Sequence, residues 1–396
     1  MHKIESLINT LCPNGVEYKP IGEIFEIRNG YTPSKANPDF WENGTIPWFR
    51  MEDIRENGRI LEDSIQHITE KAIKGKGLFK ANSIILSTTA TIGEHALILK
   101  DSLANQQLSN FSIIEKFADR LLPKFVFYYF FKIKEWCLNN VNASSFPSVD
   151  MAQLRKVSFP IPPLEVQKEI IIILNAFKEL TAELTAELTA ELTARKKQYE
   201  YYRHTLLDFN NKRNKVEFKT LGEVCKILDS KRIPITKTHR KKGIYPYYGA
   251  NGIQDYVDGY IFDGEFVLMG EDGSVMNANN TPVINWASGK IWVNNHAHVL
   301  QTKEIMKLRF LYYYLQTIDI SPFVAGTPPK INQTNLKAIP IPIPPLEVQE
   351  KIVKILDKFE SLTHDLQEGL PAEIQARIKQ YEYYRNQLLT FKKLES

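Results

Sequence analysis

Two acid-x-Lys triplets have the spacing that metal-dependent nucleases use to cut a phosphodiester bond, namely Asp229-Ser-Lys231 and Glu217-Phe-Lys219. Such triplets arise easily by chance, and a nuclease also needs further clustered acids. His296-Ala-His298 places two imidazoles on one side of a strand, but no Cys or carboxylate cluster accompanies them. Acids in the turns of a β-rich region are routine. We therefore predict no catalytic residue and no metal site, including at Asp263, Glu265, Glu271 and Asp272.

Chemistry on adenine or on ATP would need other loops. An adenine methyltransferase requires a polar-Pro-Pro-aromatic loop and a Gly-rich cofactor turn. The nearest matches, Asn37-Pro-Asp-Phe40 and Thr327-Pro-Pro-Lys330, lack the doubled Pro or the aromatic residue. The sequence also has no FxGxG-type turn and no Walker lysine motif. We predict that this chain itself binds no cofactor.

Basic residues mixed with Tyr, Asn and Gln point to nucleic-acid contact. Residues 195–242 hold 15 Lys and Arg against 5 Asp and Glu, and the stretch GIYPYYGANG follows them. The first half has a sparser set of lysines at positions 71, 74, 76 and 80. Basic side chains position a phosphate backbone, and Asn and Gln read adenine edges. The total charge of +4 hides this local surplus.

The elements that would carry these residues form an internal repeat. Residues 161–177 match residues 343–359 at 11 of 17 positions, and residues 195–209 match 377–391 at 11 of 15, both at an offset of 182. A third pair, 16–27 and 216–227, is identical at six of 12 positions. Between these blocks the halves hardly resemble each other. This pattern predicts two divergent domains on one duplicated frame.

The shared segments are predicted to be long helices. A proline cluster marks each start, and residues 164–209 then lack Pro and Gly, which predicts a helix of about 70 Å at 1.5 Å per residue. Three TAEL tetrapeptides at 181–192 continue a four-residue leucine row. In the second copy, Gly369-Leu-Pro371 predicts a break into two helices after Glu368. The residues expected to pack the helices are Leu180, Leu184, Leu188, Leu192, Leu362, Leu366, Leu370 and Ile374.

The regions between the helices have the pattern of α+β domains. Short β-branched runs at 83–87, 266–269 and 290–293 predict strands, and aromatic-rich stretches at 124–138 and 307–315 predict helices. Three widely spaced cysteines argue against a disulfide framework. No apolar run approaches the roughly 18 residues of a membrane helix. We expect a protein of the reducing cytoplasm without membrane contact.

Together the repeated PIPPLEVQ, the KQYEYYR block and the TAEL tandem resemble the specificity subunit of type I restriction–modification systems, of the TAEL-repeat type. IPWFRMEDI, SIILSTTATIG and NQQL in the first region, and PYYGANGIQDYVDGYIFDGEFVLMGEDG and VNNHAHVL in the second, are similar to its target recognition domains. The resemblance implies a non-catalytic subunit with two α+β recognition domains, separated by two helical segments packed as an antiparallel coiled coil with pseudo-two-fold repeat. The expected boundaries are 1–160, 161–210, 211–342 and 343–396.

The resemblance also implies partners. Each domain would read one half of a bipartite DNA target, while the helices set the spacing and dock two modification (adenine methyltransferase) subunits; restriction/translocase subunits would join them. S-adenosylmethionine, ATP and Mg are expected on those partners. The residues expected in helix packing or docking are Tyr199, Tyr202, Arg203, Tyr381, Tyr384 and Arg385. The candidate DNA-binding residues are Lys35, Arg50, Lys74, Lys76, Asn105, Gln106 and Gln107, then Lys231, Arg232, Lys241, Asn251, Asn294, Asn295 and His296.

Two other functions stay open at this point. The chain could be a self-sufficient DNA-modifying enzyme with disguised motifs, or a structural coiled-coil adaptor that never contacts DNA. Turnover of a methyl donor by the chain alone would favour the first of these. Failure to bind any duplex, even with a modification partner, would favour the second.

Overall fold

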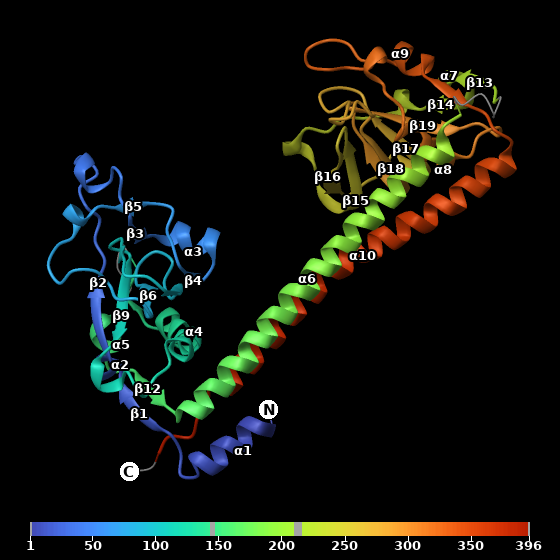
Figure 1. Ribbon diagram of the computed structural model, residues 1–396. Coiled ribbons are helices and arrows are strands. Elements are labelled where there is room, and N and C mark those ends of the chain that lie inside the picture. Colours follow the sequence, from blue (N-terminus) through green and yellow to red (C-terminus); the bar gives the residue numbers. More distant parts are fainter. Residues whose placement is uncertain (1, 143–146, 210–215, 395–396) are drawn as a thin grey trace. The chain divides into compact units, whose positions relative to one another are not determined.

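The computed structural model describes residues 2–142, 147–209 and 216–394, without the side chains of residues 2, 3 and 366. The expected domain boundary between 210 and 211 therefore lies outside the described residues. The chain divides into two compact units (Figure 1). Unit 1 comprises Met1–Thr185 and Glu373–Ser396, and unit 2 comprises Ala186–Ala372. Each unit combines a globular domain with part of both long helices.

Unit 1 is built on a five-stranded sheet backed by an aromatic helix. The strand order is β2-β9-β6-β7-β4, and a second sheet has the order β5-β3-β8. Phe130 of the helix α4 (Pro123–Asn139) packs edge-on against Phe25 and Phe111 of the main sheet, which forms the centre of the core. The strands are β2 (Phe25–Asn29), β9 (Leu108–Ile113), β6 (Ser83–Ser87), β7 (His95–Ile98), β4 (Ile60–Leu61), β5 (His67–Ile68), β3 (Ile46–Phe49) and β8 (Leu103–Ala104).

Shorter elements complete unit 1. The strand β1 pairs with β12, which directly precedes the first long helix. The remaining described helices and strands are α1 (His2–Leu11), β1 (Glu17–Pro20), α2 (Ile21–Ile24), α3 (Met51–Asn57), β10 (Val141–Asn142), β11 (Ser148–Val149), α5 (Met151–Leu154) and β12 (Ser158–Ile161). The predicted strand at 83–87 and the predicted helix at 124–138 are both confirmed.

Unit 2 is built on a six-stranded sheet in the order β14-β19-β17-β18-β15-β16, and a two-stranded sheet pairs β13 with β20. The predicted runs 266–269 and 290–293 lie inside β17 and β18, and the second aromatic stretch forms α8. The elements are β13 (Phe218–Thr220), α7 (Leu221–Val224), β14 (Cys225–Ile227), β15 (Lys242–Gly249), β16 (Gly252–Val257), β17 (Phe262–Gly270), β18 (Ile284–Val293), β19 (Ala297–Thr302), α8 (Leu308–Leu315), α9 (Gln333–Ala338) and β20 (Pro340–Pro342).

The long helices α6 (Leu164–Leu207) and α10 (Leu346–Leu388) pack together in both units. In unit 1 the rings of Phe177 and Tyr384 stack with centroids 5.6 Å apart, and in unit 2 the rings of Tyr202 and Phe359 stack at 5.0 Å. These four residues are exchanged by the 182-residue repeat. Because the early part of α6 meets the late part of α10, and the reverse holds in unit 2, the helices are antiparallel. The duplicated frame is therefore confirmed (Figure 1).

A buried glutamine begins each long helix and shows the same symmetry in atomic detail. Gln167 accepts a hydrogen bond from the N–H of Leu122 at 2.8 Å and donates to the carbonyl of Pro162 at 2.7 Å. Its counterpart Gln349 accepts from Lys307 at 2.8 Å and donates to Pro344 at 2.8 Å. Both side chains are buried. In each unit the glutamine ties its long helix to the turn that precedes the domain's aromatic helix.

The predicted break near Pro371 is wrong, because α10 continues as one helix from Leu346 to Leu388 with this proline inside it. A proline removes one N–H from the helical ladder, while packing along the length of a helix supplies most of its stability. In the leucine row, Leu180 is 63% exposed and Leu362 is 50% exposed. Partly buried members are Leu184, Leu188, Leu192, Leu370 and Ile374, while the side chain of Leu366 lies outside the described part.

Among the described residues, no helix is both long enough and apolar enough to cross a membrane. Cys12, Cys137 and Cys225 are buried thiols that form no disulfide. Burial raises the pKa of Cys137 and of Cys225 to about 12, so neither is a thiolate near neutral pH.

Candidate nucleic-acid interface

In unit 1 a tight backbone approach brings two polar loops together. The loop after β2 lies so close to the segment after β8 that a Cβ on Gly30 would stand 2.2 Å from the carbonyl oxygen of Asn105. Glycine alone fits there. The next residue, Tyr31, donates its N–H to Ala104 at 2.8 Å. Thr32 then donates to the side chain of Gln106 at 2.6 Å. The candidate amides thus lie beside a hydroxyl-rich loop.

The ring of Tyr31 brings a lysine segment to the same place. Its hydroxyl donates to the carbonyl of Ala72 at 3.0 Å and accepts the N–H of Lys74 at 2.8 Å. Lys74 and Lys35 are exposed, and neither forms an ion pair with a described residue. Ammonium groups that form no ion pair can contact phosphates, and the exposed side chain of Gln106 can contact a base edge. Of the sequence candidates, this group is the one that the fold assembles most clearly.

Other first-half candidates are engaged in contacts within the unit. The ammonium of Lys76 pairs with Glu26 at 3.0 Å, and Asn105 uses its side chain to cap the turn at Gln107. The guanidinium of Arg50 lies over the ring of Trp48, with its centre 5.7 Å from the ring centroid. Arg50 is nevertheless adjacent to the group, because the carbonyl of the preceding Phe49 accepts the N–H of Asn105 at 3.0 Å.

In unit 2, three turns meet through side chains from distant parts of the sequence. Asn251 donates to the hydroxyl of Ser274 at 2.8 Å, and His296 pairs with Asp272 through Nδ1. The N–H of Glu271 donates to the carbonyl of His296 at 2.8 Å, which joins the turn before β19 to the end of β17. Asn251 and His296 are exposed, so both present polar atoms to solvent. Asn295 lies in the same turn and is also exposed.

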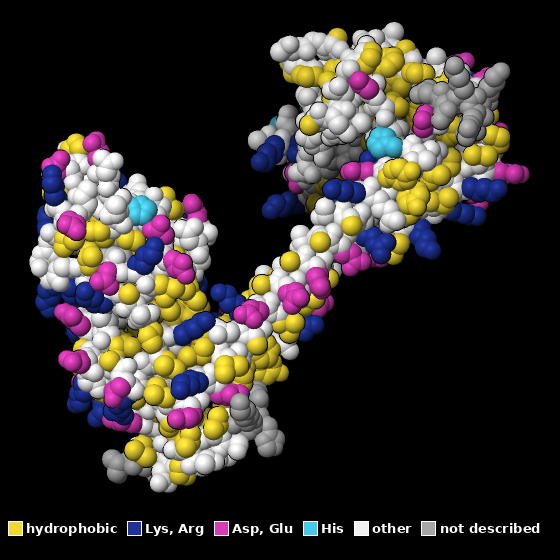
Figure 2. All heavy atoms as spheres, viewed as in Figure 1, with side chains coloured by type: hydrophobic (Ala, Val, Ile, Leu, Met, Phe, Trp, Pro, Cys, Tyr) yellow, Lys and Arg dark blue, Asp and Glu magenta, His cyan; other side chains and the backbone are white. Residues whose placement is uncertain are grey.

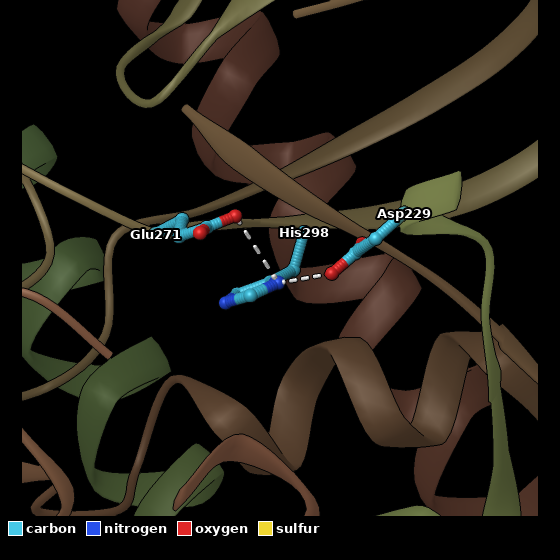
Figure 3. A group of neighbouring side chains, drawn as sticks. All are labelled: Asp229, Glu271 and His298. Carbon is cyan, nitrogen blue, oxygen red and sulfur yellow. Dashed lines mark hydrogen bonds and ion pairs between the residues drawn. The ribbon is translucent and has the colours of Figure 1, made fainter. Parts of the chain in front are cut away.

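Beneath these turns lies a buried group of Asp229, Glu271 and His298 (Figure 3). His298 is 1% exposed; its Nδ1 lies 2.6 Å from a carboxylate oxygen of Asp229, and its Nε2 lies 3.0 Å from the carbonyl oxygen of Ile331. Burial alone would raise the pKa of Asp229, but the bond from His298, the N–H of Val299 and the charge of Arg232 together lower it. The carboxylate is therefore ionised and paired.

Arg232, one of the candidate DNA-contacting residues, completes this group. Its side chain is 11% exposed, donates to Glu271 at 2.6 Å and to the carbonyl of Ala297 at 2.8 Å, and lies 3.5 Å from Asp229. The ligand atoms of the three group members lie within 4.8 Å of one another, as in a metal site. Here, however, the guanidinium of Arg232 contacts both carboxylates, and the ammonium of Lys330 also pairs with Glu271 at 3.4 Å. The geometry is that of an ion-pair network that fixes the loops above it.

The two histidines of the HxH pair have separate roles. His296 is exposed in the turn before β19, whereas His298 is buried within the strand. The Asn294 side chain is also directed inward: it is 3% exposed and accepts the N–H of His296 at 2.8 Å. By contrast, Lys231 and Lys241 are exposed and form no ion pair with a described residue.

Figure 2 shows basic and acidic side chains mixed over the visible face of each unit, so no uniformly basic face stands out in that view. Recognition would thus depend on individual loops rather than on one broad charged surface. The sequence reasoning missed Tyr31 and Thr32, which hold the unit 1 group together. Their only local signal is the Gly30-Tyr31-Thr32-Pro33 turn.

The KQYEYYR blocks attach the far end of each long helix to an aromatic helix. In unit 1 the guanidinium of Arg385 lies over the ring of Phe131 in α4, 4.2 Å from its centroid. In unit 2 the repeat-related Arg203 donates to Gln316, just after α8, at 2.7 Å. Tyr199 and Tyr381 lie beneath these arginines at 5.2 and 5.7 Å. Both blocks therefore pack against a globular domain.

The sequence and the fold were compared with known proteins. The family model for the type I restriction modification DNA specificity domain matches residues 13–194 and 213–376. The EcoprrI type I restriction enzyme specificity subunit of Escherichia coli is 42% identical over 364 residues, covering 89% of this chain and 90% of the relative. A putative type I specificity subunit of Haemophilus influenzae is 48% identical over 181 residues, covering 44% of this chain and 46% of the relative.

Two solved structures share the fold. A chain from the structure reported as "Structural basis underlying complex assembly and conformational transition of the type I R-M system" aligns with a TM-score of 0.69 at 18% identity, over 95% of this chain and 98% of its own length. The HsdS subunit from Thermoanaerobacter tengcongensis aligns with a TM-score of 0.60 at 16% identity, over 94% and 97%.

Proposed function

Because this chain belongs to the family of type I restriction–modification DNA specificity subunits, we propose that its two globular domains each read one half of a bipartite DNA target. The chain is a DNA specificity subunit, the non-catalytic component of such an enzyme, and forms part of a type I complex. In this proposal, residues 1–160 and 211–342 recognise DNA, and the helical segments 161–210 and 343–396 set the spacing between the two half-sites.

The observation that carries this proposal is a helical frame that is repeated within one chain and that holds two different sets of loops. Gln167 and Gln349 make matching hydrogen bonds, and the Phe177–Tyr384 and Tyr202–Phe359 stacks are exchanged by the repeat. The five-stranded sheet of unit 1 and the six-stranded sheet of unit 2 differ in strand order and in loop chemistry. A protein that reads two unlike half-sites needs two domains that attach to the long helices in the same way but present different surfaces to DNA.

The DNA-facing residues that the contacts favour are exposed lysines that form no ion pair with a described residue, together with one exposed amide in each unit. In unit 1 these are Lys35, Lys74 and Gln106; in unit 2 they are Lys231, Lys241 and Asn295. The lysines supply phosphate contacts, whose contribution to affinity falls as salt rises. The amides supply base-edge contacts. Lys76, Asn105, Gln107, Asn251 and His296 border the same loops, where their contacts hold the turns in place.

The helical frame also suggests how the partners assemble. Two repeat-related helical faces in one chain suit two copies of a modification subunit, an adenine methyltransferase, in equivalent poses. Restriction/translocase subunits then join this core. S-adenosylmethionine, ATP and Mg are assigned to those partners, because no loop of this chain has the sequence pattern that would bind them. Such a complex acts on the chromosome, which places it in the cytoplasm.

Methylome sequencing tests the proposal directly. Cells without other adenine methylation should express this chain together with its modification subunit. The expected result is a split adenine-methylated motif with a fixed gap, and an unmethylated genome would contradict the proposal. Lys74→Gln with Gln106→Ala should change or weaken only one half of the motif, and Lys241→Gln with Asn295→Ala only the other. The modification subunit alone is the control.

The tetrapeptide repeat allows a second measurement on the same cells. One TAEL unit adds about 6 Å to a helix, which is comparable with one to two base-pair steps of DNA. Deleting Thr185–Leu188 should therefore shorten the gap in the motif while leaving both half-sites unchanged. A gap that stays the same would show that these helices do not set the spacing.

A further inference from the structure

A cavity of about 460 Å³ lies in unit 1 between α4, α6 and α10. Its walls are aromatic, with Phe127 and Phe131 from α4 and Tyr381 from the KQYEYYR block. Lys178 of α6 and Arg385 of α10 add two cations. The cavity is thus lined by both long helices, to which the proposed function assigns partner docking, and by α4 of the first globular domain, and its lining includes none of the residues assigned to DNA.

The unusual feature of this cavity is a buried arginine without an acidic partner. Arg385 is 6% exposed, and its Nε is buried without a hydrogen-bond acceptor. No ion pair joins it to a described residue; its contacts are the rings of Phe131 and Tyr381. Burial lowers its pKa, Arg59 lowers it further, and Tyr381, Glu382 and Glu135 oppose this only in part. A buried charge in this state is costly unless an acceptor reaches it.

The other cations of the cavity differ in how they are compensated. Arg59 and Lys134 both pair with Glu94, the latter at 2.6 Å. Lys178 is exposed and forms no ion pair with a described residue. Lys178, which is exposed, and Arg385, which is buried, are therefore two lining cations that form no ion pair with a described residue.

The corresponding positions in unit 2 show how the side chains around the repeat-related arginine differ between the two units. The 182-residue repeat equates Lys178 with Glu360 and Arg385 with Arg203. In unit 2, Glu360 and Asp357 both accept hydrogen bonds from Arg309, and Arg203 donates to Gln316. In unit 2 the guanidinium of Arg203 thus has a side-chain acceptor in Gln316, although its Nε, like that of Arg385, is buried without one. In unit 1, Lys178 occupies the position that corresponds to Glu360. The guanidinium of Arg385 contacts the ring of Phe131, whereas that of Arg203 contacts Gln316.

We propose that the unit 1 cavity receives an Asp or Glu side chain of a partner protein, which binds between Lys178 and Arg385. A guanidinium binds a carboxylate through two parallel N–H···O bonds, and the aromatic walls keep water away from that pair. A DNA backbone fits poorly, because Glu135 and Glu382 also line the cavity and would repel a continuous row of phosphates. The inference rests on the proposed function, in which the partner is the modification subunit.

The decisive variant is Lys178→Glu, which places the unit 2 residue at an exposed position where folding is not at risk. Arg385→Met removes the deep cation and keeps an aliphatic stem over Phe131. Each should weaken binding of the purified full-length chain to the modification subunit by about ten- to hundredfold in Kd, as expected for a charge-assisted hydrogen-bond pair. Lys178→Arg should bind normally. Lys156→Glu reverses the charge of another exposed unit 1 lysine that lies outside the cavity, so it is the matched control and should leave the Kd unchanged.

The outcomes separate this inference from the proposed function. Thermal unfolding checks that each variant is folded. If Arg385→Met does not fold, the result for Lys178→Glu alone decides. Wild-type affinity of a folded Lys178→Glu variant would overturn the inference, even if the wild-type complex methylates a split motif. Loss of DNA affinity with unchanged partner affinity would overturn it too, since it would mark a phosphate site. A wild-type pair that assembles but methylates nothing counts against the proposed function instead.

Discussion

Among the described side chains, each unit buries one histidine, and the two lie in opposite surroundings. His95 of unit 1 is enclosed by the rings of Phe127, Phe130 and Phe131 and contacts only backbone carbonyls through its nitrogens. His298 of unit 2 lies between the carboxylates of Asp229 and Glu271, which Arg232 also contacts. One domain is thus held by apolar packing around a neutral ring, and the other by a closed network of charges. A shared frame does not require its two domains to be stabilised alike.

The largest effect should follow from breaking the unit 2 network. Arg232→Met leaves Asp229 and Glu271 without their guanidinium, and removing one partner of a buried ion pair costs about 3–5 kcal/mol. Hydrogen exchange should show faster opening in β14, β17 and β19, while β6 and β9 keep their protection. Lys330→Gln is the control, because its exposed pair with Glu271 contributes less than about 1 kcal/mol. Equal effects of the two variants would contradict the network.

Acid should loosen unit 1 before unit 2. Burial, with the charge of Arg59, lowers the pKa of His95 from 6.5 to about 3. The unfolded chain then binds one proton more than the folded chain between these values, so stability is full above pH 6.5 and falls by about 1.4 kcal/mol per pH unit below it. The lowered pKa of Asp229 acts the same way only below its ordinary value of 3.8.

Hydrogen exchange at pH 7 and at pH 5, corrected for intrinsic rates, measures this difference. Protection in β6, β7 and α4 should drop at pH 5, whereas β17 and β19 should hold. His95→Gln keeps a polar side chain that does not titrate, so it should abolish the pH 7 to pH 5 difference in unit 1. A pH response that survives in this variant would assign the acid sensitivity to another group.

The two buried glutamines offer a test in which the units should agree. Gln167→Leu and Gln349→Leu each leave one buried N–H and two carbonyls without their partner, which costs about 1–3 kcal/mol per unsatisfied group. Because the bonds match, the two losses of unfolding free energy should be similar when chemical denaturation is measured. A strongly unequal pair would mean that the repeat symmetry is geometric but not energetic.

The smallest expected effect concerns the continuous α10. A Cβ on Gly369 would meet nothing within 4 Å, so Gly369→Ala should stabilise the helix by about 0.5–1 kcal/mol. Thermal unfolding should show a modest rise in Tm. Gly30→Ala in unit 1 is the opposite control, since its Cβ would clash with the carbonyl of Asn105. A fall in Tm for Gly369→Ala would indicate a bend that the helix needs at this point.

Much of this architecture was predictable, because its signals are local. The absence of Pro and Gly over 164–209 predicted α6, which ends two residues earlier, at Leu207. β-Branched runs predicted β6 and parts of β17 and β18 for the same reason. The break at Pro371 was mispredicted, because a helix-breaking residue is a local signal and the stabilising partner helix is distant in sequence.

The candidate site was less predictable than the fold. Lys231 and Arg232 are neighbours with the same charge, yet one is exposed and the other lies in a buried network. His296 and His298 differ in the same way. Nothing in the composition distinguishes these pairs, since the difference depends on which side of a short turn or strand is covered by Glu271 and the loop before Ile331.

By itself, the sequence determined the duplication, the long helices, the missing catalytic motifs and the family. These properties follow from the periodicity of the sequence and from residue identity, and neither depends on contacts between segments far apart in the chain. Only the tertiary structure decided which cations are free and which are neutralised, and it alone showed that Arg385 is buried without an acid while Arg203 has Gln316. Burial and charge pairing arise from segments far apart in the chain, so they exist only once the chain has folded.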